Sequence, residues 1–384
     1  MKVCFICPDY PPGLHGGTGT VIQTLARALV RRGHEIRVVG VHPPTHPSPD
    51  YDEDHGVRVW RLRDPGRRLS WIAARYALYK LLAAWSRAGE IDLIEIPDWE
   101  GWAALWPRLP VPVIVRLHGS ASYFALETGQ PVPPALFVLE GASLRRADFW
   151  CSVSRHAARR TQELFGWNGE GGAVLHNPVD GPSAPTTGPR SRHEVVFTGT
   201  LAPKKGIVPL LRAWPRVVRV CPEAKLHVYG KDLEEDPRGL TRSFLLSRTD
   251  PAVIGSLRFH GHVQRPLLLE ALQHARLAVF PSYSEGFGLA PFEAMSCGCP
   301  TIYTRRSCGP ELAEHERNAL LIDPDDPEEI AMCIIRLLRD DELSARLGEA
   351  GRKWTEERFS IERLAPLNED FYRGCLGAFE RNMR

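Results

Sequence analysis

The chain has 384 residues, a formal net charge of +2 and a hydrophobic fraction of 43%, which favours two domains with large cores and gives no indication of nucleic-acid binding. No apolar run approaches the roughly 20 residues of a membrane span, and Lys2 is followed by strand-like residues rather than by a signal peptide. Several of the nine cysteines lie in strand-like runs, where buried thiols behave as small hydrophobes, so we expect a cytoplasmic protein.

The first segment predicts a βαβ unit. Residues 3–7 and 35–41 have the apolar pattern of strands, and residues 21–29 form an amphipathic helix between them. The turn before that helix contains Gly16 and Gly17. Its glycine spacing is not the Gly-x-Gly-x-x-Gly of a dinucleotide-binding fold, which argues against a dehydrogenase. The plain alternative is a tight turn that needs a positive φ angle.

Residues 71–87 predict a helix that is rich in aromatic and basic side chains. Such a helix can lie on a membrane surface, or it can pack against a sheet while its basic groups stay in solvent. We expect the second arrangement, with weak peripheral contact at the inner membrane face as the alternative.

Two further strands, at residues 92–96 and 111–117, are followed by polar and aromatic side chains. Asp98, Trp99 and Glu100 come after the first strand, and His118 and Tyr123 after the second. Open α/β sheets bind ligands at the carboxyl ends of their strands. A lone histidine is usually structural, but its place between a strand end and a glycine favours a functional role for His118.

Residues 181–192 hold three prolines and two glycines, a composition that marks a linker. Strand patterning restarts at residue 194, so a second α/β domain begins near residue 193. Its first turn carries Thr200, Lys204 and Lys205. Later strand-like segments end at Gly230 and lead to His262 and Val263.

The most informative stretch follows the buried strand predicted at residues 277–280. Two glycines, Gly286 and Gly288, break the pattern, and a helix begins near Leu289. Backbone N–H groups and the helix dipole favour an anion at such a turn. Glu285 and Glu293 flank it, and carboxylates there suit sugar or ribose hydroxyls. The plain alternative is an ordinary turn with two solvated acids.

An acidic cluster at residues 323–329 could suggest a metal site, but prolines flank it and a helix follows. We expect these acids to cap the start of that helix. The cysteine pairs Cys4 with Cys7 and Cys297 with Cys299 lack a histidine-spaced second pair, so we expect no zinc site.

The string from Glu285-Gly286-Phe287-Gly288 to Glu293-Ala294-Met295, followed by Gly298-Cys299-Pro300, resembles the donor-site signature of the family-4 retaining glycosyltransferases. The resemblance covers the chain from Gly16-Gly17 to the tail. It implies an α/β GT-B fold, in which two doubly wound Rossmann-like domains face across a cleft and a C-terminal helix crosses back to the first. The implied segments are an acceptor-side domain at 1–183, a linker at 184–192, a nucleotide-sugar domain at 193–355 and a helical tail at 356–384.

The resemblance also implies site residues. The catalytic group comprises His118, Lys205 and Glu285. The diphosphate-binding group comprises Gly16, Gly17, Thr200, Lys205, Gly288 and Leu289. The donor-sugar group comprises Glu285, Gly286, Phe287 and Gly288. The ribose and base group comprises Gly230, His262, Val263 and Glu293. The acceptor group comprises Asp98, Trp99, Glu100 and Tyr123, which suits a small polar acceptor or a glycan end.

The implied activity is retaining transfer of a sugar from a UDP- or GDP-sugar to an acceptor hydroxyl, without a metal or other cofactor, in carbohydrate or natural-product biosynthesis. Relatives usually carry an arginine where Thr200 stands, which weakens the diphosphate assignment because threonine has no charge and no bidentate donor pair. The alternatives are a nucleotide-sugar epimerase on the same fold and an inactive regulator that binds nucleotide sugars.

Overall fold

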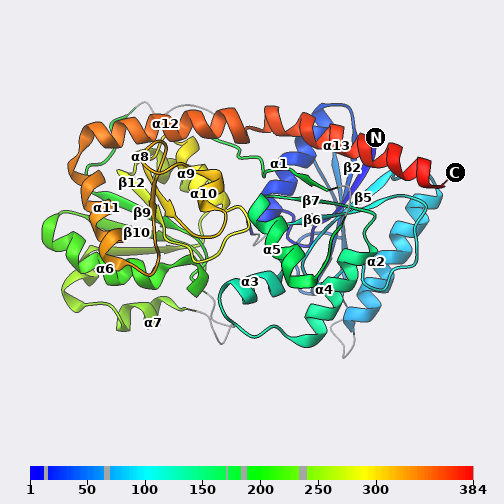
Figure 1. Cartoon of the computed structure of the whole chain (residues 1–384), viewed down its shortest axis with the longest axis horizontal. Coiled ribbons are helices and arrows are strands. Elements are labelled where there is room, and N and C mark those ends of the chain that lie inside the picture. Colours follow the sequence, from blue (N-terminus) through cyan, green and yellow to red (C-terminus); the bar gives the residue numbers. More distant parts are fainter. Residues whose placement is uncertain (13–15, 65–69, 170–171, 183–187, 233–239, 384) are drawn as a thin grey trace. The chain divides into compact units, whose positions relative to one another are not determined.

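A computed structural model describes residues 1–12, 16–64, 70–169, 172–182, 188–232 and 240–383. The chain divides into two compact units (Figure 1). The first unit comprises Met1–Pro178 and Ile361–Arg384, and the second comprises Val179–Ser360.

The first unit contains an eight-stranded sheet with the order β3-β4-β2-β1-β5-β6-β7-β8. All neighbouring strands are parallel except β3 and β4, which pair antiparallel at one edge. The strands are β1 (Lys2–Ile6), β2 (Glu35–His42), β3 (Tyr51–Asp54), β4 (Val57–Arg63), β5 (Leu93–Pro97), β6 (Val113–Leu117), β7 (Phe149–Ser152) and β8 (Ala173–Val174). The predicted βαβ opening is confirmed.

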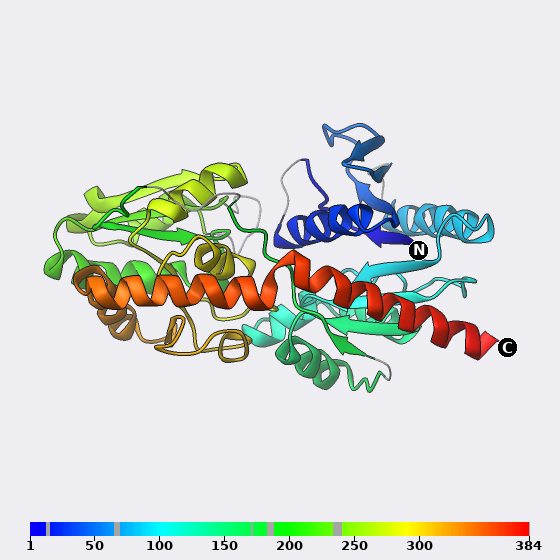
Figure 2. The same ribbon diagram turned by 90° about the horizontal axis from the view of Figure 1, so that it is seen from above.

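Helices cover both faces of this sheet, which explains why its inner strands are apolar on both sides. The helices are α1 (Gly17–Arg31), α2 (Ser70–Arg87), α3 (Ala121–Glu127), α4 (Pro134–Arg146), α5 (Arg155–Phe165) and α13 (Ile361–Met383). Leu25 of α1 and Ile361 and Tyr372 of α13 share one core with β1, while Leu82 of α2 and Leu144 of α4 belong to the core on the other face. Figure 2 shows α13, in red, running across the strands of the first sheet.

A buried polar network fixes α13 to this sheet. Arg116 on β6 forms a two-bond ion pair with Glu95 on β5, at 2.8 and 2.9 Å. Arg116 also donates to Asn368 Oδ1 at 2.6 Å, and Tyr372 donates to Glu95 at 2.7 Å. All four side chains are buried. Because an unpaired charge in this place would be costly, the network fixes where the C-terminal helix docks.

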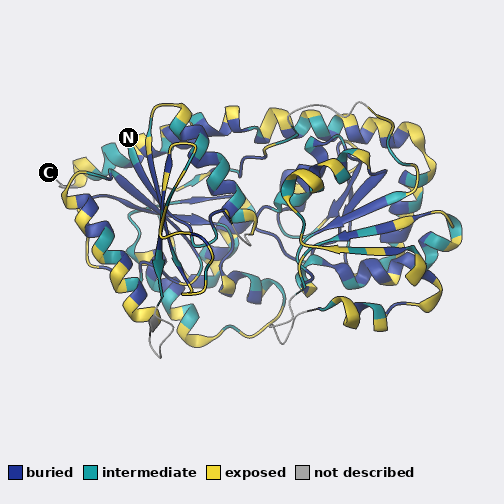
Figure 3. Ribbon diagram, turned by 180° about the vertical axis from the view of Figure 1, so that it is seen from behind, coloured by how far each residue is buried: buried dark blue, intermediate teal, exposed yellow. Residues whose placement is uncertain are grey.

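The second unit contains a fully parallel sheet with the order β11-β10-β9-β12-β13-β14. Its strands are β9 (Glu194–Thr198), β10 (Lys225–Tyr229), β11 (Leu257–Gly261), β12 (Leu277–Phe280), β13 (Thr301–Thr304) and β14 (Leu320–Ile322). Its helices are α6 (Ile207–Val220), α7 (Arg242–Ser247), α8 (Arg265–His274), α9 (Leu289–Ser296), α10 (Gly309–Leu312), α11 (Pro327–Arg339) and α12 (Asp341–Phe359), with 3₁₀ turns at Pro203–Lys205 and Pro251–Ser256. Figure 3 shows the inner strands of both sheets buried and the outer helix faces exposed.

The chain leaves the first unit after Pro178, somewhat earlier than the expected linker at 184–192, of which residues 184–187 lie outside the described part. Val179 donates its backbone N–H to Phe359 O at 2.8 Å, which ties this segment to the second unit. The chain returns to the first unit after Ser360 rather than at the expected residue 356. The reason is that α12 continues to Phe359, whose ring packs against Phe287 and Phe292 of the second unit.

The contacts of α2 and α11 test two predictions, that α2 packs against the sheet and that the acids at 323–329 cap α11. One face of α2 packs on the sheet through Leu78 and Leu82, as expected, while Trp71 and Tyr76 remain exposed. Asp326 caps α11 by accepting the N–H of Glu329 at 3.0 Å, and Asp323 and Asp325 form ion pairs with Arg306. In the part of the chain that the structure describes, no helix combines the length and apolarity needed to cross a bilayer.

Candidate active site

Two glycine turns of the second unit meet where the strand order reverses, between β9 and β12. The turn after β9 ends at Gly206, and the turn after β12 begins at Pro281. A Cβ on Gly206 would lie 1.8 Å from the carbonyl oxygen of Pro281, and Gly206 has a φ of +73°. Tyr283 donates its backbone N–H to Lys204 O at 2.7 Å. The reversal point is where open α/β sheets bind ligands.

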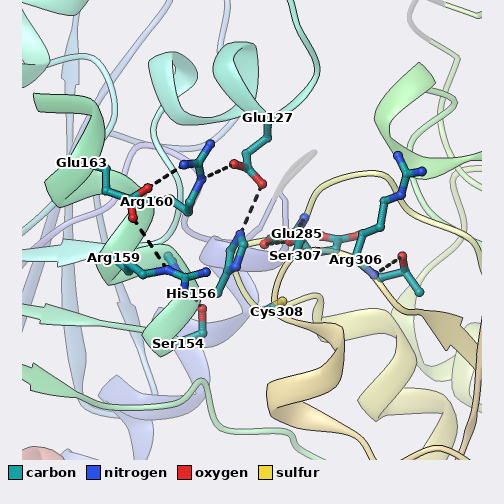
Figure 4. A network of polar contacts seen from close by, with 12 residues as sticks. Glu127, Ser154, His156, Arg159, Arg160, Glu163, Glu285, Arg306, Ser307 and Cys308 are labelled. Atoms are coloured by element: carbon teal, nitrogen blue, oxygen red, sulfur yellow. Dashed lines mark hydrogen bonds and ion pairs between the residues drawn. The ribbon is translucent and has the colours of Figure 1, made fainter. Parts of the chain in front are cut away.

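This close approach brings Lys205 and Glu285 together. Lys205 Nζ lies 2.7 Å from Glu285 Oε1 and 2.9 Å from Oε2. The Ser282 hydroxyl donates to the same carboxylate at 2.8 Å. The backbone of Glu285 is held as well, because its N–H donates to Ser307 Oγ at 2.9 Å and the Ser307 hydroxyl donates to its carbonyl at 2.6 Å (Figure 4). The carboxylate is therefore fixed at the beginning of the turn.

The turn then leads into the N-terminus of α9. Gly288 has a φ of +75°, and a Cβ there would lie 2.7 Å from Tyr303 Oη. Leu289 is the first residue of the helix. The side chain of Phe287 is buried against Phe292 and Phe359, so only backbone groups of this residue can contact a ligand. Gly286 is buried within the turn.

Glu293 lies one turn inside α9 and is nearly buried. Its Oε1 accepts from Arg265 Nε at 2.8 Å, and Arg265 Nη1 lies 3.5 Å from Asp180 Oδ2. The structure therefore pairs the predicted ribose-binding carboxylate with a guanidinium from the start of α8, a partner that the sequence did not indicate.

The other predicted residues of the second unit lie at neighbouring strand ends. Gly230 directly follows β10, and a Cβ there would lie 1.8 Å from Gly199 O, so this glycine allows the segments after β9 and β10 to approach closely. Thr200 follows Gly199 and is half-buried. His262 is exposed and Val263 half-buried after β11. Among the described residues, neither forms a hydrogen bond or ion pair with Glu293.

Two features of the second unit escaped the sequence reasoning. Burial, together with the neighbouring Lys205, lowers the pKa of Lys204 to about 8. Tyr229 stacks on His260 with ring centroids 4.3 Å apart, and His260 stacks on His227 at 5.2 Å. His227 and Tyr229 are two residues apart on β10 and therefore lie on one face of the sheet. This spacing was the feature of the sequence from which the aromatic stack could have been predicted.

In the first unit, His118 follows β6 as predicted. Burial and the nearby Arg116 lower the pKa of His118 to about 3, so the imidazole is neutral at physiological pH. The backbone N–H groups of His118 and Gly119 donate to the two oxygens of Asp98, at 3.1 and 3.0 Å. Asp98 therefore positions the His118 backbone. Burial raises the pKa of Asp98 to about 7, against the effect of these hydrogen bonds.

The remaining predicted acceptor residues differ in exposure. The Trp99 ring is half-buried with its centroid 5.7 Å from that of His118. Glu100 is exposed and has a φ of +61°. Tyr123 is fully buried and packs against Phe124 and His156. The Asp98 and Tyr123 side chains are thus enclosed by protein, unlike the open positions expected for them.

Glu140 on α4 is a second buried carboxylate that the sequence analysis missed. It accepts the backbone N–H groups of Glu100, Ala121 and Ser122 at 3.1 to 3.2 Å. It thereby fixes the loops after β5 and β6 together. A glutamate within a helix carries no motif, so no signal in the sequence marked it.

Gly16 and Gly17 lie at the N-terminus of α1 and are exposed. Asp9 Oδ2 accepts the N–H groups of Gly16 and Gly19 at 3.3 and 3.2 Å. A carboxylate of the chain therefore occupies the amide groups where the resemblance places a diphosphate. The sequence analysis did not single out Asp9.

Another polar cluster of the first unit lies between α3 and α5 (Figure 4). His156 Nε2 lies 3.2 Å from Glu127 Oε2, and Arg160 Nε donates to Glu127 Oε1 at 2.7 Å. The hydrogen bond with His156, with Arg160 adding to it, holds the pKa of Glu127 below its usual value. Spacing of four residues places His156 and Arg160 on one helix face.

Both units match models of known protein families. Residues 15–181 match the family described as Glycosyltransferase Family 4, and residues 192–340 match the one described as Glycosyl transferases group 1. The chain belongs to the family-4 glycosyltransferases. It is a glycosyltransferase with the two-domain GT-B fold.

Similar proteins span nearly the whole chain of this glycosyltransferase. A glycogen synthase of Mycobacterium tuberculosis is 25% identical over 97% of this chain and 94% of its own. The structure of sucrose-phosphate synthase from Thermosynechococcus elongatus has a TM-score of 0.82 at 20% identity, covering 98% of this chain and 99% of that one. The Anabaena protein HepE in complex with UDP-glucose has a TM-score of 0.76 at 17% identity, covering 97% and 100%.

Proposed function

We propose that this glycosyltransferase moves a sugar from a nucleoside diphosphate sugar to an acceptor hydroxyl, with retention at the anomeric carbon and without a metal ion. The observation that carries the proposal is the Lys205–Glu285 pair, with 2.7 Å between ammonium and carboxylate, directly before the N-terminus of α9. A cation and a carboxylate that meet before a helix N-terminus suit a sugar joined to a diphosphate, because the N–H groups and the dipole of such a terminus favour an anion.

In this proposal the second unit binds the donor. The N–H groups of Gly288 and Leu289, the Lys205 ammonium and the Thr200 hydroxyl would contact the diphosphate. Glu285 would accept hydrogen bonds from the sugar hydroxyls, with the backbone of Gly286 and Phe287. Glu293 would bind the ribose hydroxyls by exchanging its bond to Arg265, and Gly230, His262 and Val263 would border the base. The UDP-glucose complex of HepE supports a nucleotide-sugar donor, so UDP-sugars are tested first and GDP-sugars second.

The proposed transfer needs no nucleophile from the protein, because the acceptor oxygen and the diphosphate account for every bond and proton that changes. The bond between the anomeric carbon and the phosphate oxygen breaks, and its electron pair leaves with the nucleoside diphosphate. The acceptor oxygen forms the new bond on the same face of the sugar. The acceptor proton goes to the departing phosphate oxygen. Negative charge therefore grows on the diphosphate, and groups that already point at it lower the barrier most.

Lys205 and the helix amides would supply the positive potential that a metal ion supplies in other transferases. Lys204 adds to it, although its lowered pKa leaves part of its population neutral above pH 8. In the first unit, His118 would act as a neutral hydrogen-bonding group, because a pKa of about 3 excludes an imidazolium at physiological pH.

The test is product analysis with and without a chelator. The full chain would be incubated with UDP-glucose, or with a GDP-sugar, and candidate acceptors in excess EDTA. We expect undiminished turnover and a product whose anomeric proton coupling in NMR matches that of the donor. An inverted product would contradict retention. Loss of activity in EDTA that magnesium or manganese restores would contradict the metal-free proposal.

A control separates an enzyme from a regulator that only binds nucleotide sugars. Slow donor hydrolysis without acceptor should be detectable in the unaltered protein and reduced in Lys205→Met. Tight nucleotide binding with no hydrolysis and no transfer to any acceptor would favour the regulator.

A further inference from the structure

The strand β13 and the loop after it hold the glycine turn of the second unit from one side. Tyr303 lies on β13, and Ser307 and Cys308 follow that strand. Tyr303 and Cys308 are fully buried, and Ser307 is half-buried. Because β12 and β13 pair in parallel, the turn after β12 and the loop after β13 leave the same edge of the sheet. The sequence analysis gave none of these three side chains a role at the site.

Two donors from this segment converge on one carbonyl of the turn. The Tyr303 hydroxyl donates to Phe287 O at 3.1 Å, and the Cys308 thiol donates to the same oxygen at 3.5 Å. Burial raises the pKa of Cys308 to about 12, so its thiol keeps its proton at physiological pH. The carbonyl of Phe287 is therefore directed toward β13.

The direction of this carbonyl determines where the next N–H group points. A peptide unit is planar and trans, so its C=O and N–H bonds point in opposite directions. Since Phe287 O faces Tyr303, the N–H of Gly288 faces away from β13. Gly288 is the residue directly before α9. An N–H group at a helix N-terminus is placed where an anion is favoured.

The Tyr303 hydroxyl also lies against the Gly288 backbone. Gly288 has a φ of +75°, and a Cβ there would lie 2.7 Å from Tyr303 Oη. The hydroxyl thus occupies the space in which a side chain at position 288 would lie. The Tyr303 ring packs edge-on against Phe292 with centroids 5.8 Å apart. Tyr303→Phe therefore removes the contact with the turn and keeps the ring that packs in the core.

Ser307 holds the other end of the same turn. Its hydroxyl accepts from the N–H of Glu285 at 2.9 Å and donates to the Glu285 carbonyl at 2.6 Å. Ser307 has a φ of +55°, which is uncommon for a residue other than glycine. The preceding residue, Arg306, forms ion pairs with Asp323 and Asp325 at 2.8 and 2.5 Å. A backbone in this conformation persists where the surrounding contacts over-determine it.

The bond from Tyr303 to Phe287 has two interpretations that differ in what its removal changes. A buried tyrosine needs an acceptor for its hydroxyl in any core. If the bond only satisfies the hydroxyl, its loss lowers stability and leaves the turn in place. If the bond orients the turn, its loss lets the N–H of Gly288 change direction in a folded protein.

We propose that Tyr303 is a positioning residue, which holds the Phe287 carbonyl together with Cys308 and thereby directs the N–H of Gly288 toward the diphosphate of the donor. The inference rests on the proposed function for the identity of the ligand, whereas the direction of the peptide unit does not depend on it. An N–H group that is already oriented lowers the barrier, because it needs no reorientation when negative charge develops on the departing oxygen. Tyr303 itself contacts no substrate atom.

The first measurement observes the turn in the full chain without any substrate. Phenylalanine precedes glycine only at Phe165–Gly166 and Phe287–Gly288, so labelling with ¹³C-carbonyl phenylalanine and ¹⁵N-glycine selects these two amides in NMR. Tyr303→Phe should lower the order parameter of the Gly288 amide from the ~0.85 of rigid backbone toward the ~0.6 of flexible backbone. Gly166, which lies in the first unit, should not change. In Tyr303→Phe/Cys308→Ala, which removes both donors, the order parameter of Gly288 should fall further.

The second measurement identifies what the N–H group contacts. Tyr303→Phe should weaken the binding of UDP about 5- to 10-fold in calorimetry and leave that of uridine unchanged, because only UDP carries the diphosphate. Turnover should fall about 10- to 100-fold, less than the 10²- to 10³-fold lost when such a donor is removed outright. The donor Michaelis constant should change much less than turnover, since the charge on the leaving phosphate grows as the bond breaks.

Ser344→Ala provides the control. It removes another buried hydroxyl of the second unit, which donates to Leu337 O at 2.7 Å on the far side of no glycine turn. Urea denaturation should show similar stability for Ser344→Ala and Tyr303→Phe, but Ser344→Ala should leave UDP binding and turnover unchanged. Equal effects of the two variants on turnover would show that Tyr303 acts only through stability and would overturn the proposal.

The positioning role and the proposed enzyme can fail separately. Transfer by the unaltered protein, with turnover and the Gly288 order parameter unchanged in Tyr303→Phe/Cys308→Ala, would reject the positioning role and keep the enzyme. A Gly288 amide that becomes mobile in a protein that transfers no sugar would reject the enzyme and keep the control of the turn by Tyr303. Equal weakening of UDP and uridine binding would show that the N–H of Gly288 does not contact the diphosphate.

Discussion

Removing the ammonium of Lys205 tests the chemistry and the architecture of the second unit together. Lys205→Met keeps the aliphatic stem, and Glu285→Gln keeps the shape of the carboxylate. The Lys205 side chain is 25% exposed and that of Glu285 is 8% exposed. Lys205→Met therefore leaves a nearly buried carboxylate that keeps the Ser282 hydroxyl bond at 2.8 Å.

The size of the effect follows from the geometry. Two unit charges about 3 Å apart attract by roughly 5–6 kcal/mol at an effective dielectric constant near 20. Desolvation of both groups offsets much of this attraction. We expect each single substitution to lower the free energy of unfolding by about 1–3 kcal/mol, and the double variant to recover most of the loss, because it leaves no unpaired charge.

Urea denaturation of the four proteins measures the coupling free energy, and steady-state kinetics measures activity. Stability should return in Lys205→Met/Glu285→Gln, but turnover should stay about 10²- to 10³-fold below the unaltered protein, as for the loss of a preorganised donor. The donor dissociation constant should change much less, because charge on the leaving diphosphate grows during the reaction.

An exposed pair in the same unit provides the control. Arg317 and Glu314 lie 2.6 Å apart with side chains 72% and 42% exposed. The cycle Arg317→Met/Glu314→Gln should give a coupling of at most about 0.5 kcal/mol and normal turnover. Zero coupling between Lys205 and Glu285 would refute the structural reasoning. Collapse of donor affinity with normal turnover at saturation would refute the role at the transition state.

Three further predictions concern other residues of the two units. Glu293→Ala should weaken nucleotide binding about 10- to 100-fold by calorimetry while the protein stays folded, because a charged hydrogen bond to hydroxyls is worth roughly 1.5–3 kcal/mol; unchanged affinity in a folded variant would remove its ribose role. Burial raises the pKa of Asp98 from 3.8 to about 7, so its contribution to stability is complete below pH 4 and is lost as the pH rises through 7. The free energy of unfolding should then fall between pH 5 and pH 8 by about 2–3 kcal/mol more in the unaltered protein than in Asp98→Asn, and parallel pH profiles would contradict this. Gly206→Ala should destabilise by more than about 3 kcal/mol, because its Cβ would lie 1.8 Å from Pro281 O, whereas Gly33→Ala, with a φ of +86° and open space, should cost only about 1 kcal/mol; similar melting temperatures for the two would contradict the close approach.

The sequence predicted the elements better than the contacts between them. Parallel strands buried on both faces have continuous apolar runs, so β1, β2, β9 and β12 were readable from pattern alone. Residues 205 and 285 meet only because β9 and β12 are neighbours in the sheet, and strand order is not written in any local pattern. The resemblance assigned both residues to the donor but did not indicate that they form an ion pair.

Polar residues at strand ends were the weakest point of the sequence reasoning. Asp98 looked like a group that faces a ligand, yet it accepts two backbone N–H groups and is buried. Tight turns leave N–H groups without partners, and a buried turn needs an acceptor for them. Nothing in the order Asp98-Trp99-Glu100 tells which side chain turns inward to do this and which remains exposed.

The cost of leaving a buried polar group unpaired also explains why three sites that were predicted to bind a substrate already contain partners from the chain. Asp9 accepts from the amides at the start of α1, Arg265 pairs with Glu293, and Lys205 pairs with Glu285. Groups arranged to bind charge or hydroxyls cannot be left unpaired when they are half-buried, because each would incur a desolvation cost. Under the proposed function, a nucleotide sugar bound by the second unit would therefore exchange the bonds of Glu293 and Lys205 rather than add to them. Its net binding free energy is the difference between two sets of contacts, which favours interactions that strengthen only as charge develops on the leaving diphosphate.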